Sequence, residues 1–224
     1  MLVNLRDVSG LAGGSAPALF RSAGPHGLTA RDLAALCAEL GLRTIIDLRT
    51  DAERELVPWP DPPAGVRVHS VPFGVSSVEP GALAAVSGTA EFGLMYARMA
   101  RRSAPELVRI VRLLRDGPAL VHCAAGKDRT GVVVAVVLSL LGVAAARIVA
   151  DYALTEAAMP LIRSRVRHPA LPEETLGALP EILMRAPAEA MLACLAELGD
   201  VRGLLAGHGL TDGDVAALRT AFGL

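Results

Sequence analysis

Residues 118–131 read PALVHCAAGKDRTG, a short apolar run, then a tight loop of small and polar residues, then the start of an apolar helix. The run PALVH has the composition of a buried strand, and the apolar residues that follow Gly131 are typical of a core helix. Strand, tight loop and helix in this order form the repeating unit of α/β proteins. The stretch therefore predicts an α/β fold, with the loop at one end of a strand.

Apolar runs and helical patterns alternate on both sides of this stretch. Strands are predicted at 17–22, 44–48 and 66–73. Helices are predicted at 29–40, 51–56, 89–102, 103–116, from Arg129 onward, and at 156–167, 186–198 and 211–222, with a capping box at Ser103–Glu106. The alternation indicates a mostly parallel central sheet flanked by helices.

The composition narrows the classes of function. The chain carries 22 basic and 23 acidic residues, and a formal charge of −1 favours neither nucleic acid nor an anionic membrane as a partner. Aromatic residues make up 3% of the chain, too few for a base-stacking surface. The apolar stretch 131–150 is interrupted by Gly142 and Arg147, so we expect a buried helix there and no integral membrane segment.

The cysteines and the first residues of the chain indicate the cellular compartment in which the protein is expected. Cys37, Cys123 and Cys194 are widely spaced and odd in number, which favours neither a disulfide framework nor a zinc site. The opening residues MLVNLRDVSG carry charges where a signal peptide needs an apolar run. We therefore expect a cytoplasmic protein, with export by another route left open.

The loop after the strand has the spacing of an oxyanion site. Five residues separate Cys123 from Arg129, a length at which a loop can curl around a tetrahedral oxyanion and direct its backbone N–H groups and the helix N-terminus at it. The positive electrostatic potential of these N–H groups and of the helix N-terminus also favours the thiolate form of Cys123, which is the candidate nucleophile. Arg129 can offer a bidentate guanidinium to two phosphate oxygens. The residues expected to line the bound phosphate are Ala124, Ala125, Gly126, Lys127 and Thr130.

Neighbouring side chains are expected to support this loop. Thr130 can donate its hydroxyl to the sulfur when a phosphoenzyme is hydrolysed. His122 is better placed to hydrogen-bond the cysteine backbone than to act as a base, and an ordinary strand-end histidine is the alternative. Asp47 and Arg49, at the end of a predicted strand, are expected to form a buried ion pair. A buried cysteine before an ordinary helix is the alternative for the whole segment, and the density of the pattern argues against it.

The loop HCAAGKDRTG resembles the HCxxGKDRTG signature of the bacterial tyrosine and dual-specificity phosphatases that also act on phosphoinositides. The similarity extends to NLRDV at 4–8, LFRS at 19–22, DLR at 47–49, Asp151-Tyr152 and the C-terminal GLTDGDVAALR, although only the loop is specific enough to assign chemistry. The resemblance implies a cysteine-dependent phosphatase that needs no metal or cofactor. It also implies one phosphatase domain over residues 1–224, with a helical lid at 153–200.

Lys127 is the only lysine in a chain with 21 arginines. By the resemblance, it contacts the phosphorylated substrate, and its flexible ammonium can reach a phosphate beyond the one that is cleaved. Phosphoinositides are therefore expected substrates beside phosphotyrosine and phosphoserine/threonine proteins. The sequence leaves the preference among these substrates and the oligomeric state open.

A proton for the leaving oxygen often comes, in cysteine-dependent phosphatases, from an aspartate in a loop spelled WPD. This chain contains Trp59-Pro-Asp61. Ligands of an open parallel sheet bind at the carboxyl ends of its strands, whereas this loop leads into the amino end of the strand predicted at 66–73. We therefore expect the loop at the opposite edge of the sheet from Cys123, without a role as acid.

The loop expected on the correct edge, 74–90, contains no aspartate. Asp128, inside the signature loop, is therefore favoured as the general acid and base. Glu79 and Glu91 are the alternatives, and Asp128 could equally brace the loop by pairing with a neighbouring arginine.

Two other functions remain open. One is a module that binds phosphorylated ligands without turning them over, which the missing loop aspartate encourages and the intact Cys123, Arg129 and Thr130 oppose. The other is arsenate reduction or sulfur transfer, which also uses a cysteine in an anion-binding loop. No suitably placed second cysteine is evident in the sequence for that chemistry.

Overall fold

The structure is a computed structural model that describes residues 2–74, 86–165 and 180–224. Among these residues, five strands form one sheet in the order β1-β2-β5-β3-β4. Their bounds are β1 Arg6–Asp7, β2 Leu19–Ser22, β3 Thr44–Asp47, β4 Arg67–Ser70 and β5 Ala119–His122. The strands β2, β5, β3 and β4 run parallel, and β1 pairs antiparallel with β2 at the edge. The predicted α/β class, with a mostly parallel sheet, is confirmed.

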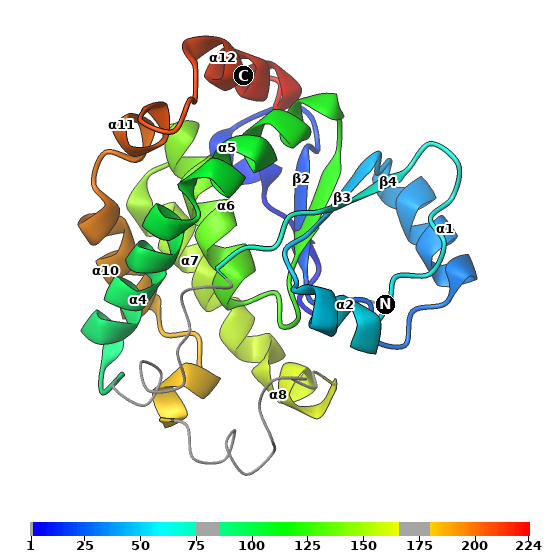
Figure 1. Ribbon diagram of the computed structural model, residues 1–224, viewed down its shortest axis with the longest axis horizontal. Coiled ribbons are helices and arrows are strands. Elements are labelled where there is room, and N and C mark those ends of the chain that lie inside the picture. Colours follow the sequence, from blue (N-terminus) through cyan, green and yellow to red (C-terminus); the bar gives the residue numbers. More distant parts are fainter. Residues whose placement is uncertain (1, 75–85, 166–179) are drawn as a thin grey trace.

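Helices cover both faces of the sheet, with α1 on one face and α4, α5, α6 and α7 on the other (Figure 1). The α-helices are α1 Ala30–Leu40, α2 Asp51–Leu56, α4 Thr89–Arg102, α5 Ala104–Leu113, α6 Asp128–Leu140, α7 Ala145–Ala153, α8 Thr155–Arg165, α10 Ala188–Leu198, α11 Val201–Ala206 and α12 Asp212–Ala221. Short 3-10 helices are η1 Ser9–Ala12, η3 Leu114–Asp116 and η4 Glu181–Met184. The short elements β1, η1, η4 and α11 were not predicted.

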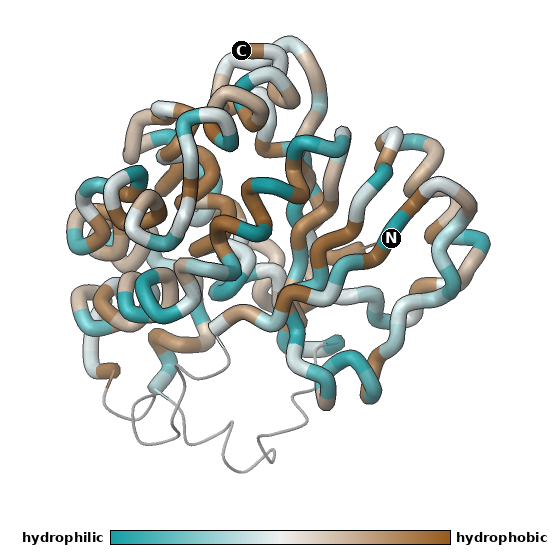
Figure 2. Tube along the Cα trace, turned by 45° about the horizontal axis from the view of Figure 1, so that its top comes forward, coloured by the Kyte–Doolittle hydropathy of each residue, from teal (hydrophilic) through white to brown (hydrophobic). Residues whose placement is uncertain are grey.

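The core divides at the sheet because successive strand residues point to opposite faces. Ile45 and Leu120 join the smaller cluster under α1. Ile46 and Val121 join the larger cluster under the other helices. All four are fully buried, and the brown segments at the centre of Figure 2 follow these apolar strands.

The long apolar stretch divides into two helices. Gly142 has a φ of +81°, a left-handed conformation that ends α6, and α7 begins at Ala145. Nine residues of α6 are buried, as expected of a core helix. No helix in the described part of the chain is long and apolar enough to cross a membrane.

The capping box predicted at Ser103 is wrong. Ser103 is also the C-cap of α4, where its N–H donates to the carbonyl of Met99 at 3.1 Å, and its φ of −109° and ψ of 29° differ from the extended backbone of an N-cap. Its hydroxyl accepts instead from the N–H of Gly74 at 3.2 Å. Because Ser103 ends α4 and also precedes α5, it does not take the extended backbone that the expected N-cap requires.

Candidate active site

The signature loop lies at the carboxyl end of the central strand. Cys123 follows β5 directly, and α6 begins at Asp128, so the loop lies at the N-terminus of this helix. The N–H of Gly126 donates to Cys123 Sγ at 3.2 Å, and the cysteine is 1% exposed. A helix N-terminus and a backbone donor therefore meet at one sulfur, an arrangement suited to a negative charge.

Gly126 determines how the loop can turn. Its φ is +65°, and a Cβ at this position would lie 2.3 Å from the carbonyl oxygen of Ser22. Only glycine fits both the left-handed backbone and the close approach to β2. The Gly126 carbonyl accepts from Asn4 Nδ2 at 3.0 Å and from Arg21 Nη2 at 2.9 Å, so the back of the loop is held from two sides.

Several donors of the loop have no partner within the described part of the chain. The amides of Ala124, Ala125 and Lys127 donate to no residue that the structure describes. The hydroxyl of Thr130 is buried and likewise unpaired within the described chain, so the predicted hydrogen bond to the sulfur is not formed here. Unpaired donors around one thiol fit an anion that would satisfy them.

Arg129, in the first turn of α6, is paired with Glu53 of α2. Arg129 Nη1 donates to Glu53 Oε2 at 2.6 Å, and Arg129 Nη2 donates to Glu53 Oε1 at 2.5 Å. Burial alone would lower the pKa of Arg129, but Glu53 and the nearby Cys123 and Asp128 raise it. The N–H of Thr50 also donates to Glu53 Oε2 at 2.8 Å, so the carboxylate that aims the guanidinium is fixed by the cap of α2.

Asp128 lies on the loop side of α6 and is one-third exposed. Its Oδ1 accepts a short hydrogen bond from Tyr96 Oη and lies 3.3 Å from Lys127 Nζ. The hydroxyl of Tyr96, from α4, is in turn 2.8 Å from the hydroxyl of Tyr152, from α7. Asp128 therefore has a cation beside it, but this cation is Lys127 and not the expected arginine.

The Lys127 side chain is bound by backbone carbonyls at and after η4. Its side chain is 4% exposed, and Nζ donates to the carbonyls of Leu183 and Arg185, the latter at 3.0 Å. Nζ also lies 5.3 Å from the centre of the Phe92 ring. The lysine therefore links the signature loop to η4.

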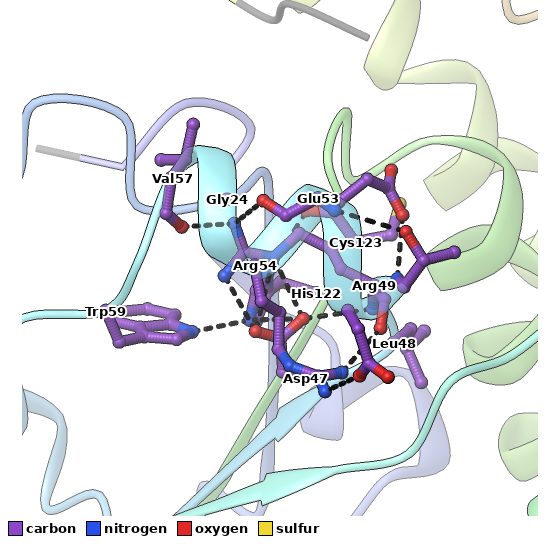
Figure 3. A network of polar contacts seen from close by, with 12 residues as sticks. Gly24, Asp47, Leu48, Arg49, Glu53, Arg54, Val57, Trp59, His122 and Cys123 are labelled. Carbon is purple, nitrogen blue, oxygen red and sulfur yellow. Dashed lines mark hydrogen bonds and ion pairs between the residues drawn. The ribbon is translucent and has the colours of Figure 1, made fainter. Parts of the chain in front are cut away.

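His122 contacts the cysteine backbone, with Nδ1 3.1 Å from the Cys123 carbonyl oxygen. Figure 3 shows the indole of Trp59 pointing at this histidine, with Nε1 3.0 Å from His122 Nε2. Indole nitrogen only donates, so Nε2 is the acceptor and the ring hydrogen is on Nδ1. Asp47 Oδ1 is farther from Nε2, at 3.5 Å, and is already hydrogen-bonded to Arg49. His122 is therefore held on both sides, as a supporting residue is.

The expectation that the Trp59-Pro-Asp61 loop lies at the opposite edge of the sheet is wrong for its tryptophan. Trp59 packs edge-on against the ring of His122, with centroids 4.9 Å apart, beside the cysteine. The segment begins at the carboxyl edge because α2 follows β3 there and the chain then has to pass the sheet to reach β4. Asp61 itself is exposed.

The other predicted residues lie as follows. Asp47 and Arg49 form the expected buried ion pair, 2.7 Å apart, at the end of β3. Glu91 is exposed on α4, and Glu79 lies outside the described residues.

The N-terminal segment braces the loop from behind. Arg21 is 1% exposed and donates to Asp151 Oδ2 at 2.6 Å, and Arg6 donates to Asp151 Oδ1 at 2.6 Å. Burial opposes the charge of Asp151, but the two guanidinium groups lower its pKa. Arg21 is therefore neutralised by Asp151 and supports the structure of the loop.

The described parts of the segment 153–200 differ in their packing. The residues Ala190, Met191 and Cys194 of α10 are fully buried in the core between α4 and α7. In η4, Leu183 is buried in the same core, and the residues that follow η4 are held by polar contacts: Glu156 of α8 accepts from Arg185 Nε at 3.0 Å and from the N–H of Ala186 at 2.6 Å. Figure 1 shows α8 at the same end of the molecule as α2.

Sequence reasoning missed the residues that hold the site from a distance. Glu53 carries one usable signal, since it is the third residue of a helix that follows the carboxyl end of a central strand. Tyr96 and Tyr152 carry another, because they are the only two tyrosines of the chain. Asn4 and Asp151 fall in the family-like blocks NLRDV and Asp151-Tyr152, but nothing local in the sequence indicates their contacts.

Comparisons with known proteins agree with the geometry. Residues 1–223 match the model of the tyrosine phosphatase family. The chain is 33% identical over 196 residues to the triple specificity protein phosphatase PtpB of Mycobacterium tuberculosis, covering 73% of this chain and 70% of that relative. It is 38% identical over 66 residues to a tyrosine-protein phosphatase of Nostoc commune, covering 28% of this chain and 22% of the relative. The crystal structure of P. aeruginosa TpbA covers 92% of this chain, and 91% of its own, with 23% identity and a TM-score of 0.39.

Proposed function

The chain belongs to the tyrosine phosphatase family, and from this premise we propose that it hydrolyses phosphate monoesters through a phosphocysteine intermediate on Cys123. The observation that carries the proposal is the setting of Cys123 Sγ: it lies in the loop before the N-terminus of α6, accepts from the Gly126 N–H, and shares that loop with amides that have no partner among the described residues. Such donors stabilise the charge of a transferring phosphoryl group.

In the first step, the thiolate of Cys123 attacks phosphorus, the bond from phosphorus to the leaving oxygen breaks, and its electron pair stays on that oxygen. Asp128 gives the leaving oxygen a proton. Arg129 Nη1 also donates to the carbonyl of Leu48 at 3.4 Å, which leaves the Nε hydrogen and the second hydrogen of Nη2 to hold the phosphoryl oxygens while the Glu53 pair is kept.

In the second step, water attacks the phosphorus and gives a proton to Asp128, and the electron pair of the phosphorus–sulfur bond returns to Cys123. The hydroxyl of Thr130, which has no partner among the described residues, can donate to the departing sulfur. The loop amides of Ala124, Ala125 and Gly126 face the same anion throughout.

Replacement of the nucleophile tests the proposal. Cys123→Ser should abolish phosphate release from p-nitrophenyl phosphate while the protein stays folded. Cys194→Ala is the matched control, because burial raises the pKa of Cys194 to about 12 and keeps that thiol inert. Undiminished release from Cys123→Ser would refute the mechanism, and tight binding by the wild type without any release would favour a phosphate-binding module.

We propose three substrate classes: phosphotyrosine, phosphoserine/threonine and phosphoinositides. The relative PtpB is named a triple specificity protein phosphatase, which supports this breadth. Lys127 would have to leave the carbonyls of Leu183 and Arg185 to reach a second phosphate, so substrate choice and the position of η4 are coupled in this proposal. Lys127→Arg, assayed for phosphate release from one substrate of each class, measures that coupling.

The lid and the compartment are also proposals. We assign the lid role to α8 and η4, because exposed polar contacts join the two, from Arg163 Nη2 to the Met184 carbonyl and from Arg185 Nε to Glu156, whereas α10 is packed in the core between α4 and α7. A cytoplasmic location is supported by the three cysteines, all of which are free.

A further inference from the structure

We propose that Tyr96 and Tyr152 are positioning residues for Asp128, holding one carboxyl oxygen so that the other faces the reacting phosphate. The inference rests on the proposed phosphatase function and adds two residues to its machinery. Neither tyrosine lies near the signature loop in the sequence.

The contacts form a directed chain of hydroxyl groups. Tyr96 Oη donates to Asp128 Oδ1, which uses the only hydrogen of that phenol. The hydroxyl of Tyr152, 2.8 Å from Tyr96 Oη, must then be the donor of their shared hydrogen bond. The order Tyr152 to Tyr96 to Asp128 satisfies every hydrogen and ends on a carboxyl oxygen.

Both phenols remain protonated donors at physiological pH. Tyr96 is 0% exposed and Tyr152 is 1% exposed. Burial and the charge of Asp128 raise the pKa of each hydroxyl well above its ordinary value. The two tyrosine hydroxyl groups therefore hold Asp128 in place and do not take its proton.

Rigid packing fixes this chain in place. The Tyr152 ring lies against the first turn of α6, where a Cβ on Gly131 would be 3.0 Å from Tyr152 Cδ2. The Tyr96 ring packs against Phe92, with centroids 4.7 Å apart. Three helices, α4, α6 and α7, therefore set the position of one carboxyl group, and the last glycine of the signature makes room for the ring.

The two oxygens of Asp128 are consequently different. Oδ1 accepts the hydrogen bond from Tyr96 Oη and lies 3.3 Å from Lys127 Nζ. No hydrogen bond joins Oδ2 to any residue that the structure describes. Oδ2 is therefore the atom that exchanges protons. It gives its hydrogen to the leaving oxygen in the first step and takes one from water in the second, when the phosphorus–sulfur electron pair returns to Cys123.

The experiment compares Tyr96→Phe with Asp128→Asn on aryl phosphates with good and poor leaving groups. Tyr96→Phe keeps the ring and removes only the hydroxyl. It should slow kcat for the poor leaving group by about tenfold and for the good one by less than about threefold, since proton transfer contributes about 100-fold or more where it matters. Tyr152→Phe should give a smaller effect in the same direction.

The double variant separates positioning from packing. In the Asp128→Asn background, Tyr96→Phe should cause no further loss, because the group it positions can no longer transfer a proton. Losses that multiply, or a slowing that is equal for both leaving groups, would overturn the inference. Ser139→Ala removes a hydroxyl from the far end of α6, where it bonds to Ala135, and is the control for general loosening of that helix.

Failure of the inference differs from failure of the proposed function. If wild type releases no phosphate, or if Cys123→Ser releases as much, the phosphatase mechanism itself is wrong. If Cys123 is essential but Tyr96→Phe behaves as wild type on both leaving groups, only the positioning role is wrong.

Discussion

The pair of Arg129 and Glu53 shows what one residue outside the signature contributes to the site. Glu53 is 5% exposed, and it aligns both terminal nitrogens of the guanidinium with its two oxygens. Burial alone would raise the pKa of Glu53, but its hydrogen bond to Arg129 and the charge of that residue lower it to about 2. The charge of this carboxylate is therefore part of the folded state.

Glu53→Gln should lose stability and activity together. The folded-state pKa of Glu53 lies below the ordinary value of 4.5, so its contribution is complete above pH 4.5 and is lost as pH falls toward about 2. The difference in unfolding free energy between wild type and variant should therefore be about 3 kcal/mol at pH 7 and shrink across that window. Urea unfolding at several pH values measures it.

Turnover by Glu53→Gln should also fall by about tenfold or more, because no carboxylate then holds the Arg129 guanidinium in position for the phosphoryl oxygens. A difference in stability that stays constant from pH 7 down to pH 3 would show that the Glu53 charge does not stabilise the fold.

At the scale of elements, Lys127 joins the first turn of α6 to η4. Its ammonium donates to the carbonyls of Leu183 and Arg185, and the side chain of Arg185 pairs with Glu156 of α8. The two pieces of the proposed lid are thereby tied to each other and to the signature loop.

Lys127→Met should release η4. Hydrogen bonds to a charged donor contribute about 1.5 to 3 kcal/mol, so amide hydrogen exchange in 181–186 should accelerate by about tenfold or more. Exchange mass spectrometry measures this directly. Glu197→Gln breaks the exposed pair with Arg101 and should leave these amides unchanged. Unaltered exchange in Lys127→Met would contradict the anchoring role.

Local signals account for the elements that were predicted well. The helix α2 begins and ends as predicted, since Thr50 and Glu53 form a complete capping box. The helix α1, predicted at 29–40, likewise has strong local signals, because Thr29 forms a capping box at its start and Gly41 ends it in the left-handed conformation. The cap at Ser103 and the place of Trp59 were predicted wrongly, because each depends on a neighbouring element and not on the local sequence.

At the scale of the whole molecule, Asp151 joins three distant parts of the chain. It accepts from Arg6 in β1 and from Arg21 in β2, and it belongs to α7. Asn4 and Arg21 in turn hold the Gly126 carbonyl, so the N-terminal segment, the edge of the sheet and the signature loop form one network.

Asp151→Asn should weaken the entire fold. It leaves the buried guanidinium of Arg21 without its carboxylate, and breaking a buried pair in this way costs about 3 to 5 kcal/mol. Urea unfolding at pH 7 measures the loss. Asp212→Asn breaks the exposed pair with Arg202 and should cost less than about 1 kcal/mol. Equal losses in the two variants would contradict the bracing role.

The candidate site was predictable where it is continuous in sequence. His122, Cys123 and Arg129 lie within one short segment whose spacing carries the chemistry. The partners Glu53 and Tyr96 come from other helices, and the direction in which Lys127 points depends on residues more than 50 positions later. Their roles follow from packing between elements, which no local pattern encodes.

The most direct test of the account is to find the phosphate on Cys123. p-Nitrophenolate leaves readily without a proton, so Asp128→Asn should slow hydrolysis of the phosphoenzyme more than its formation. Acid quenching during turnover of p-nitrophenyl phosphate by this variant should then trap the phosphoenzyme, and peptide mass spectrometry should locate one phosphate on Cys123. The Cys123→Ser protein should carry none. Steady phosphate release with no phosphate on Cys123, or with phosphate on another residue, would contradict the central claim.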